Sequence, residues 1–576
     1  MPQRAGWVWL LALVFALGCR STSETAPTAT PTAGAVAAHR AHPSHLFPTA
    51  ALSDPKTFNP LLTTDATSAD VLDEVFDTLV RLDPRTGTMV PALAEGWEIS
   101  PDGTEVTFKL RKDVRFHDGV PLTAADVVFT FDAIYDPSVP TSYKDVLTID
   151  GQRITVDAPD DHTVRMRLPH AFAPLLNAVA APIIPKHRLG AALAAGEFAR
   201  QWGIDAPPGQ VIGSGPYKLD RYVPAQYLHW VRNPDYWMRD DAGTPLPYLN
   251  EQTMRIVPNQ DTAYLKFLAG ETDLHRPRPE EVPDLQAQAA ARDISVRDLG
   301  LDTGTLFVSF NRNPTHYRRN GTTDPRLTWF TDPNFLRAIA HGVDKAAIIT
   351  NVMQGYGKPA HAYISPENKQ FHNPNVRDYP YDLERARALL DAGDYVDRDG
   401  DGVREDRNGT PLEFTLNTNA GNQMREKISA ILKEDWERLG MKVHFKALDF
   451  GLLVEKLDGT FDWDAMLMGF TAGVEPHNGS NLLRSSGNLH LWHPKQDTPA
   501  TEWEAEIDRQ LETGARTLDP DGRRAAYWRI QEILGEQLPL IQIVHAPRFT
   551  AYTNALQGYA PTVWGVYRPE LMHFSE

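Results

Sequence analysis

The sequence predicts a multi-lobed protein of mixed α and β structure, on three observations. Its 576 residues exceed what a single hydrophobic core usually supports. Apolar and polar residues alternate with the period of a strand over 106–110 and 164–168. Apolar residues recur at helical spacing over 428–439 and 527–534. No fixed-period repeat runs through this mixture, which argues against a solenoid or a propeller.

The two strand segments come first along the chain. Val106, Phe108 and Leu110 alternate with polar residues, and so do Val164 and Met166. Successive side chains of a strand point to opposite faces, so this pattern predicts strands that are buried on one face and exposed on the other.

Three helices follow, and each has a start or a stop signal. Asp382 is the expected N-cap of a helix that ends at Gly393. A second helix over 428–439 ends at Gly440, and a third begins after Asp519. Upstream, Thr123 is the expected N-cap before Asp126. We expect the helices to cover sheets.

The composition sets limits on partners. Hydrophobic residues make up 42% of the chain and charged residues 23%, which is ample material for folded cores. The formal net charge is -18, and no long Lys/Arg run occurs. This balance argues against a nucleic-acid partner and provides no polybasic membrane patch.

The N-terminus predicts export. Arg4 precedes an apolar run over 7–17 that is too short to span a bilayer, so 1–18 is typical of a signal peptide. Cys19 is the only cysteine and follows small residues, in a pattern that resembles the lipobox of bacterial lipoproteins. We therefore expect a lipidated Cys19 and a flexible tether over 19–45. An ordinary signal peptide with an incidental cysteine, or an uncleaved signal anchor, is the alternative.

No catalytic motif is apparent. His117 has no carboxylate and nucleophile at a recognisable spacing, so we expect it to be structural. The run 213–215 lacks the G-x-S-x-G spacing of a hydrolase elbow. Neither H-E-x-x-H nor a phosphate-binding loop occurs, and we predict a protein that is not an enzyme.

Several motifs, in a fixed order, resemble those of the family 5 bacterial extracellular solute-binding proteins, the oligopeptide, dipeptide and nickel binders of ABC importers. The resemblance covers nearly the whole chain after the tether. The motifs that carry it are Phe58-Asn59-Pro60-Leu61, Val75-Phe76-Asp77-Thr78-Leu79, Pro91-Ala92-Leu93-Ala94-Glu95-Gly96-Trp97, Val114-Arg115-Phe116-His117-Asp118-Gly119, Gly213-Ser214-Gly215-Pro216-Tyr217, Asn233-Pro234-Asp235-Tyr236-Trp237 and Phe267-Leu268-Ala269-Gly270-Glu271.

The resemblance implies a periplasmic binding protein-like class II α/β fold, with two lobes, hinge strands and an inserted third domain. We expect the first lobe to comprise 46–79, 206–299 and 541–576. The inserted domain is expected at 80–205 and the second lobe at 300–540. Ligand binding between the lobes would then favour their closure.

The resemblance also indicates ligand-binding residues. In the oligopeptide binders the segment that matches 469–476 pairs its backbone with the ligand, and a nearby Asp holds the ligand's amino terminus. Ala472 stands where that Asp is expected, and Glu475 is a candidate to supply the charge instead. The predicted ligand-binding residues are Thr64, Asp65, Thr67, Gly469, Phe470, Thr471, Glu475, Trp492 and Trp564.

These features predict the substrate-binding lipoprotein of an ABC importer, a monomer on the extracytoplasmic face of the membrane. It would capture peptides or peptide-like oligomers and deliver them to permease and ATPase subunits. The alternatives are a binding protein for an oligosaccharide, an opine-like conjugate or a metal chelate, and a periplasmic sensor that does not import.

No cofactor is predicted, apart from one structural ion. The segment 397–405 resembles a calcium loop, because carboxylates alternate along it and a glycine stands at the turn. A solvated acidic turn is the alternative, since Asn408 replaces the Glu expected at the twelfth position. The candidate Ca²⁺ ligands are Asp397, Asp399, Asp401, Val403 and Glu405.

Overall fold

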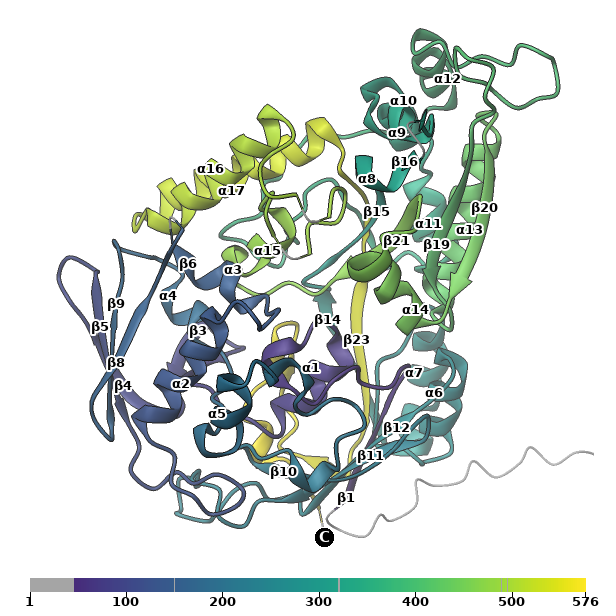
Figure 1. Ribbon diagram of the computed structural model, residues 1–576. Helices are drawn as coiled ribbons and strands as arrows, with labels where there is room; N and C mark the ends of the chain where they lie inside the picture. Colours follow the sequence, from purple (N-terminus) through teal and green to yellow (C-terminus); the bar gives the residue numbers. More distant parts are fainter. Residues whose placement is uncertain (1–45, 150, 320–321, 488, 495, 576) are drawn as a thin grey trace, which may run out of the picture. The chain divides into compact units, whose positions relative to one another are not determined.

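The computed structural model describes residues 46–149, 151–319, 322–487, 489–494 and 496–575. The predicted signal peptide, Cys19 and the tether lie outside the described residues. Within those ranges the chain forms two lobes of mixed α and β structure (Figure 1). No helix of the described part is long and apolar enough to cross a membrane.

The first lobe is organised around a four-stranded sheet. Its first strand, β1, pairs in parallel with β12, although they are separated by about 200 residues of sequence. The helix α1 (Ala66–Asp73) follows β1 and begins at the N-cap Asp65. In order across the sheet, the strands are β1 (Leu46–Ala51), β12 (Glu251–Ile256), β11 (Tyr227–Arg232) and β10 (Tyr217–Val223).

The inserted domain carries a second, antiparallel four-stranded sheet. In its centre Val106 faces Met166 and Phe108 faces Val164, and all four side chains are buried. The helix α2 (Ala124–Tyr135) packs on this sheet and on α5 (Lys186–Ala194). The strands are β4 (Ala94–Ile99), β5 (Glu105–Leu110), β9 (Thr163–Arg167) and β8 (Thr155–Asp160), preceded by the hairpin β2 (Val80–Asp83) and β3 (Thr88–Pro91).

The lobes are joined at two crossings of the chain. The strand β14 (Ile294–Leu301) leads through 302–304 into β15 (Thr305–Phe310). The strand β22 (Leu540–His545) leads through Ala546 into β23 (Pro547–Thr553). Since β14 pairs with β23 and β15 pairs with β22, the two crossings lie beside each other. The strand β13 (Leu274–His275), α6 (Gln260–Leu268) and α7 (Val282–Arg292) pack around β14 and β23.

The second lobe is built on a six-stranded sheet that is buried on both faces. Leu306, Val308 and Phe310 of β15 enter one apolar core, whereas Phe307 enters the core on the opposite face. This follows from the two-residue period of a strand. The sheet order is β18 (Lys358–Pro359), β22, β15, β21 (Ala465–Phe470), β19 (Glu413–Asn419) and β20 (Lys442–Leu448).

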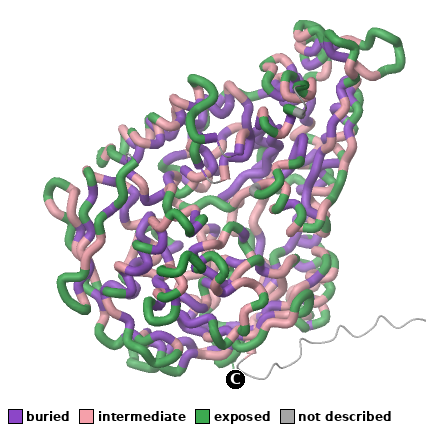
Figure 2. The backbone as a smooth tube through the Cα atoms, viewed as in Figure 1, coloured by how far each residue is buried: buried purple, intermediate pink, exposed green. Residues whose placement is uncertain are grey.

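Helices cover both faces of this sheet, and Figure 2 shows the buried residues concentrated along the strands beneath them. On one face α13 packs against β19 and β20, while α16 and α17 pair over the other core. The helices are α9 (Arg326–Thr331), α10 (Pro333–His341), α11 (Lys345–Asn351), α12 (Leu383–Ala392), α13 (Gln423–Glu437), α16 (Glu502–Arg516) and α17 (Pro520–Gln537).

The predicted elements are confirmed. The strands over 106–110 and 164–168 are β5 and β9, and the three helices are α12, α13 and α17. Asp382 and Asp519 accept hydrogen bonds from backbone N–H groups at the starts of α12 and α17, as N-caps do. At α2, the Asp126 carboxylate accepts the backbone N–H of Thr123 at 2.9 Å.

Candidate functional site

The end of β21 presents unpaired main chain. Phe470 still pairs with Thr305 of β15, but β19 pairs with β21 only as far as Met466. The next three residues, 471–473, are exposed. Among the described residues, no hydrogen bond reaches their backbone N–H or C=O groups. An extended ligand could therefore pair with this segment as an added strand does.

The two residues before this segment, Gly469 and Phe470, are held in place by the second lobe. The Gly469 carbonyl accepts a hydrogen bond from the Arg425 guanidinium at 3.3 Å. The Phe470 ring stacks on Phe307, with their centroids 5.9 Å apart. Gly304, between the hinge strand and β15, has no room for a side chain, because a Cβ atom there would lie 1.9 Å from the Phe470 carbonyl oxygen. The hinge and the segment are thus in direct contact.

Glu475 uses its charge within the second lobe. Its side chain is buried, with 5% of the residue exposed, and forms an ion pair with Arg523 at 2.7 Å. The same carboxylate accepts the backbone N–H of His477 at 3.1 Å. A buried carboxylate with these two partners has its charge compensated without a ligand.

The predicted aromatic residues are placed differently from each other. Trp492 is 1% exposed, donates its indole N–H to Glu504 at 2.9 Å and packs on His490, as a core residue does. Trp564 is half-buried, and its backbone N–H donates to Thr562 in the turn between β25 (Pro561–Thr562) and β26 (Gly565–Val566).

The predicted residues of the first lobe lie at the start of α1. Thr64 is exposed. Asp65 is buried and accepts hydrogen bonds from the backbone N–H of Ser68 at 2.9 Å and from its hydroxyl at 2.6 Å. The Thr67 hydroxyl lies 3.1 Å from that of Ser53. Asp65 and Thr67 thus have partners within the lobe.

Two further carboxylates on α1 were missed by the sequence analysis. Asp70 and Asp73 are exposed, yet desolvation by the surrounding protein raises the pKa of each, that of Asp73 to about 7. The charge of Asp70 also raises the pKa of Asp73, and the charge of Asp65 raises that of Asp70. The positive charges of Arg276 and Arg548 lower the pKa of Asp70. Exposed carboxylates that are desolvated in this way are ready to accept a cationic group.

These carboxylates begin a series of charges that crosses the hinge. Arg548, at the start of β23, lies 3.7 Å from the Asp302 carboxylate, which follows β14. Desolvation lowers the pKa of Arg425 to about 10, and the charge of Asp302 opposes that shift. Because Arg425 also donates to the Gly469 carbonyl, the series ends at the last residues of β21, directly before the unpaired segment 471–473. The only sequence signal was the three-residue spacing of Asp70 and Asp73, which places them on one face of a helix.

The two lobes contact each other beside the hinge and away from it. Lys427 of α13 forms an ion pair with Glu280 at 2.7 Å. From the inserted domain, the Ala173 backbone N–H donates to the Ala515 carbonyl at 2.8 Å, and the Phe172 ring meets the His477 ring edge-on at 5.2 Å. Together these contacts hold the lobes against each other.

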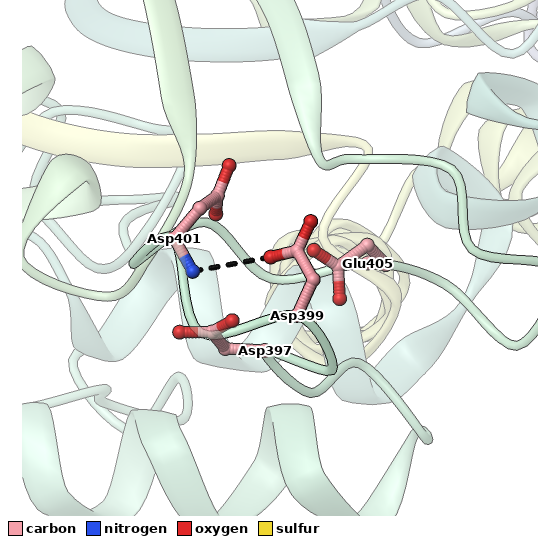
Figure 3. Close-up of side chains that lie close together, drawn as sticks. All are labelled: Asp397, Asp399, Asp401 and Glu405. Atoms are coloured by element: carbon pink, nitrogen blue, oxygen red, sulfur yellow. Dashed lines mark hydrogen bonds between the residues drawn. The ribbon is translucent and has the colours of Figure 1, made fainter.

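The predicted calcium loop follows α12 and is shown in Figure 3. Carboxylate oxygens of Asp397, Asp399, Asp401 and Glu405 all lie within 4.8 Å of one another. Asp397 also accepts the backbone N–H groups of Gly400 and Gly402, and the Val403 N–H donates to Asp401 at 2.7 Å. Oxygen ligands at this spacing suit Ca²⁺, and the ion stays a prediction.

Comparisons with known proteins agree with this architecture. Residues 88–490 match the family model for "Bacterial extracellular solute-binding proteins, family 5 Middle". The chain is 26% identical over 530 residues to the "Probable ABC transporter-binding protein" of Deinococcus radiodurans, covering 88% of each chain. It is 26% identical over 527 residues to the oligopeptide-binding protein AppA of Bacillus subtilis, covering 88% of this chain and 87% of AppA.

Two solved structures show the same fold. AppA in complex with a nonapeptide superposes with a TM-score of 0.79 at 24% identity, covering 93% of this chain and all of AppA. NikZ of Campylobacter jejuni in complex with Ni(L-His) superposes with a TM-score of 0.74 at 21% identity, covering 92% of this chain and 97% of NikZ.

Proposed function

Because this chain belongs to family 5 of the bacterial extracellular solute-binding proteins, we propose that it is the substrate-binding lipoprotein of an ABC importer. Its ligand is a peptide or a peptide-like oligomer that binds between the two lobes. Acylated Cys19 anchors the protein outside the cytoplasm, and the tether lets the folded body reach the permease. The permease and ATPase subunits receive the ligand.

The unpaired backbone of 471–473 is the single observation that carries the choice of a peptide. A peptide offers the same N–H and C=O groups in an extended register, so it can satisfy this segment whatever its side chains are. The AppA structure, which holds a nonapeptide, has the same fold. Each additional main-chain hydrogen bond contributes about 1 kcal/mol.

The charges on α1 supply the end-group recognition that Ala472 lacks. Since Glu475 is already paired with Arg523, Asp70 and Asp73 are the carboxylates that accept the ligand's ammonium group. Arg276 and Arg548 lie close enough to Asp70 to lower its pKa, and they accept a carboxylate of the same ligand. A zwitterionic oligomer matches both signs.

Closure follows from the placement of these groups on both sides of the hinge. The ligand pairs with the second lobe through 471–473 and with the first lobe through α1, so only the closed arrangement makes both sets of contacts. The chain between the lobes is short at 302–304 and at Ala546, and a few residues absorb the rotation.

A metal chelate is the second candidate ligand, because NikZ, whose printed ligand is Ni(L-His), has the same fold. The mixed charges near the hinge favour any zwitterionic or chelating ligand. The unpaired strand segment, however, favours a ligand with a peptide backbone over a compact complex.

Native mass spectrometry of the purified full chain tests the proposal. A series of co-purified masses that differ by amino-acid residues is the expected result. A discrete mass that corresponds to a sugar or a metal chelate would overturn the peptide assignment and leave the importer role in place.

A further inference from the structure

A second charged region lies in the first lobe and the inserted domain. It is a cavity of about 480 Å³, and four arginines contribute to its wall. Asp113 is the one carboxylate in the lining, within a chain whose net charge is -18. The lining residues are Arg81, Pro91, Arg111, Asp113, Trp237, Met238, Arg239 and Arg568. None of them belongs to the ligand site described above.

The four arginines come from segments that are distant in the sequence. Arg81 lies in β2, Arg111 follows β5, Arg239 follows β11, and Arg568 lies close to the C-terminus. Arg568 has a backbone φ of 44°, in the left-handed region that a residue with a side chain rarely adopts. Four like charges drawn to one cavity repel one another unless an anion compensates them.

Two of these guanidinium groups already have partners. Arg81 forms an ion pair with the buried Glu570 at 2.6 Å. Arg568 lies 3.7 Å from the fully exposed Asp241, a contact that solvent weakens. The cavity's remaining positive charge therefore rests mainly on the other two arginines.

Arg111 and Arg239 keep donors available. Arg111 donates its Nε–H to the Ala92 carbonyl at 2.8 Å and lies 4.3 Å from the centre of the Trp237 ring, which fixes its plane. Arg239 donates one N–H to the Gly243 carbonyl at 3.0 Å. Neither forms an ion pair with any described residue, so their other N–H groups are free to bind oxygen atoms of a ligand.

We propose that this cavity is a second binding site, for a small polyanion that carries phosphate or carboxylate groups. The planar guanidinium group binds both kinds of anion through paired hydrogen bonds, and several converging arginines suit a ligand with more than one anionic group. The site holds a soluble anion or the headgroup of an anionic lipid. It does not depend on what binds between the lobes.

The chain contains a matched control for Arg239. Arg115 is also exposed, donates to the carbonyl of Gly119 at 2.9 Å, and bridges to Pro121 as Arg239 bridges to Pro245. It lies outside the cavity lining. Arg239→Glu and Arg115→Glu therefore make the same chemical change in the same local structure, and only the first alters the cavity.

Isothermal titration calorimetry with pyrophosphate and with citrate tests the site on the full chain. We expect saturable binding that Arg239→Glu and Arg568→Gln each weaken at least tenfold and that Arg115→Glu leaves unchanged. Flotation is compared between phosphatidylglycerol and phosphatidylcholine vesicles, because the lipid anchor binds both; a lipid source is identified if phosphatidylglycerol gives the greater flotation and Arg239→Glu abolishes that excess. The proposal is overturned if neither probe nor vesicle binds, or if Arg115→Glu weakens binding as much as Arg239→Glu.

Discussion

From the sequence, both ends of the segment 471–475 are candidates for ligand binding, but the structure places them differently. At one end, Glu475 is an acidic residue in a segment that is predicted to bind the ligand, but its carboxylate is buried against Arg523. At the other end, 471–473 have unremarkable side chains, and their main chain has no hydrogen-bond partner among the described residues. The difference teaches that a group is available to a ligand only when the fold has left it without a partner.

The largest effect is expected at the buried end. Glu475→Gln leaves the Arg523 guanidinium buried without a counter-charge, so the free energy of unfolding should fall by about 3 to 5 kcal/mol. Urea denaturation measures it. The control is Glu506→Gln, because Glu506 pairs with Arg529 at 2.8 Å on the surface, where such a pair contributes about 1 kcal/mol or less. Equal losses in the two variants would contradict the contrast.

The next effect is expected at the open end, and on binding alone. Ala472→Pro removes one N–H group that the fold does not use, so peptide affinity should fall about fivefold, as expected for one lost main-chain hydrogen bond of about 1 kcal/mol. Calorimetry with the co-purified peptide measures the affinity, and urea denaturation should show unchanged stability. Ala472→Ser keeps the N–H and serves as the control. An unchanged affinity in Ala472→Pro would mean that 471–473 do not pair with the ligand.

A pH dependence should appear at α1. Desolvation raises the pKa of Asp73 from 3.8 to about 7, so the folded protein holds this proton more tightly than the unfolded chain does. The stability contribution is fully present below pH 3.8 and is lost as the pH rises through about 7.

Asp73→Asn should remove this loss. The stability difference between Asp73→Asn and the native chain should therefore grow from pH 4 to pH 7 and stay constant above it, as measured by urea denaturation across that range. A difference that does not change with pH would show that Asp73 ionises normally and is not desolvated.

The smallest effect is expected at the loop that begins at Asp397. Its carboxylates accept some backbone N–H groups, and their oxygens also lie within 4.8 Å of one another. Addition of Ca²⁺ should raise the melting temperature by a few degrees, because an ion that binds only the folded state stabilises it. Differential scanning calorimetry measures the shift, which should vanish with EDTA and in Asp399→Asn. A shift that survives Asp399→Asn would place the ion elsewhere, and no shift would favour the solvated turn.

Local features of the fold could be predicted from the sequence, because their causes lie within a few residues. Asp382 and Asp519 cap helices through hydrogen bonds to N–H groups three residues away. Gly103 and Gly119 adopt positive φ values of 70° and 86°, as expected in Asp-Gly turns. The alternation at β5 and β9 also matches the buried pairs across those strands.

The candidate site could be predicted only in part, because its partners are far apart in the sequence. Nothing near Glu475 indicates that Arg523 neutralises it, and nothing near Trp492 indicates a hydrogen bond to Glu504 in α16. Likewise, the approach of Arg276 and Arg548 to Asp70 depends on how the hinge strands bring three segments together. Motifs indicate where a site lies, but tertiary contacts decide which of its polar groups remain unpaired and can bind a ligand.

The contact between the inserted domain and the second lobe has a kinetic consequence. Opening the lobes must break the hydrogen bond from Ala173 to Ala515 and separate the rings of Phe172 and His477. These contacts favour the closed arrangement of the lobes, and none of the four residues is among the predicted ligand-binding residues. If the ligand binds between the lobes, as proposed, we expect its dissociation rate, and with it the residence time, to depend partly on a surface that the ligand does not touch.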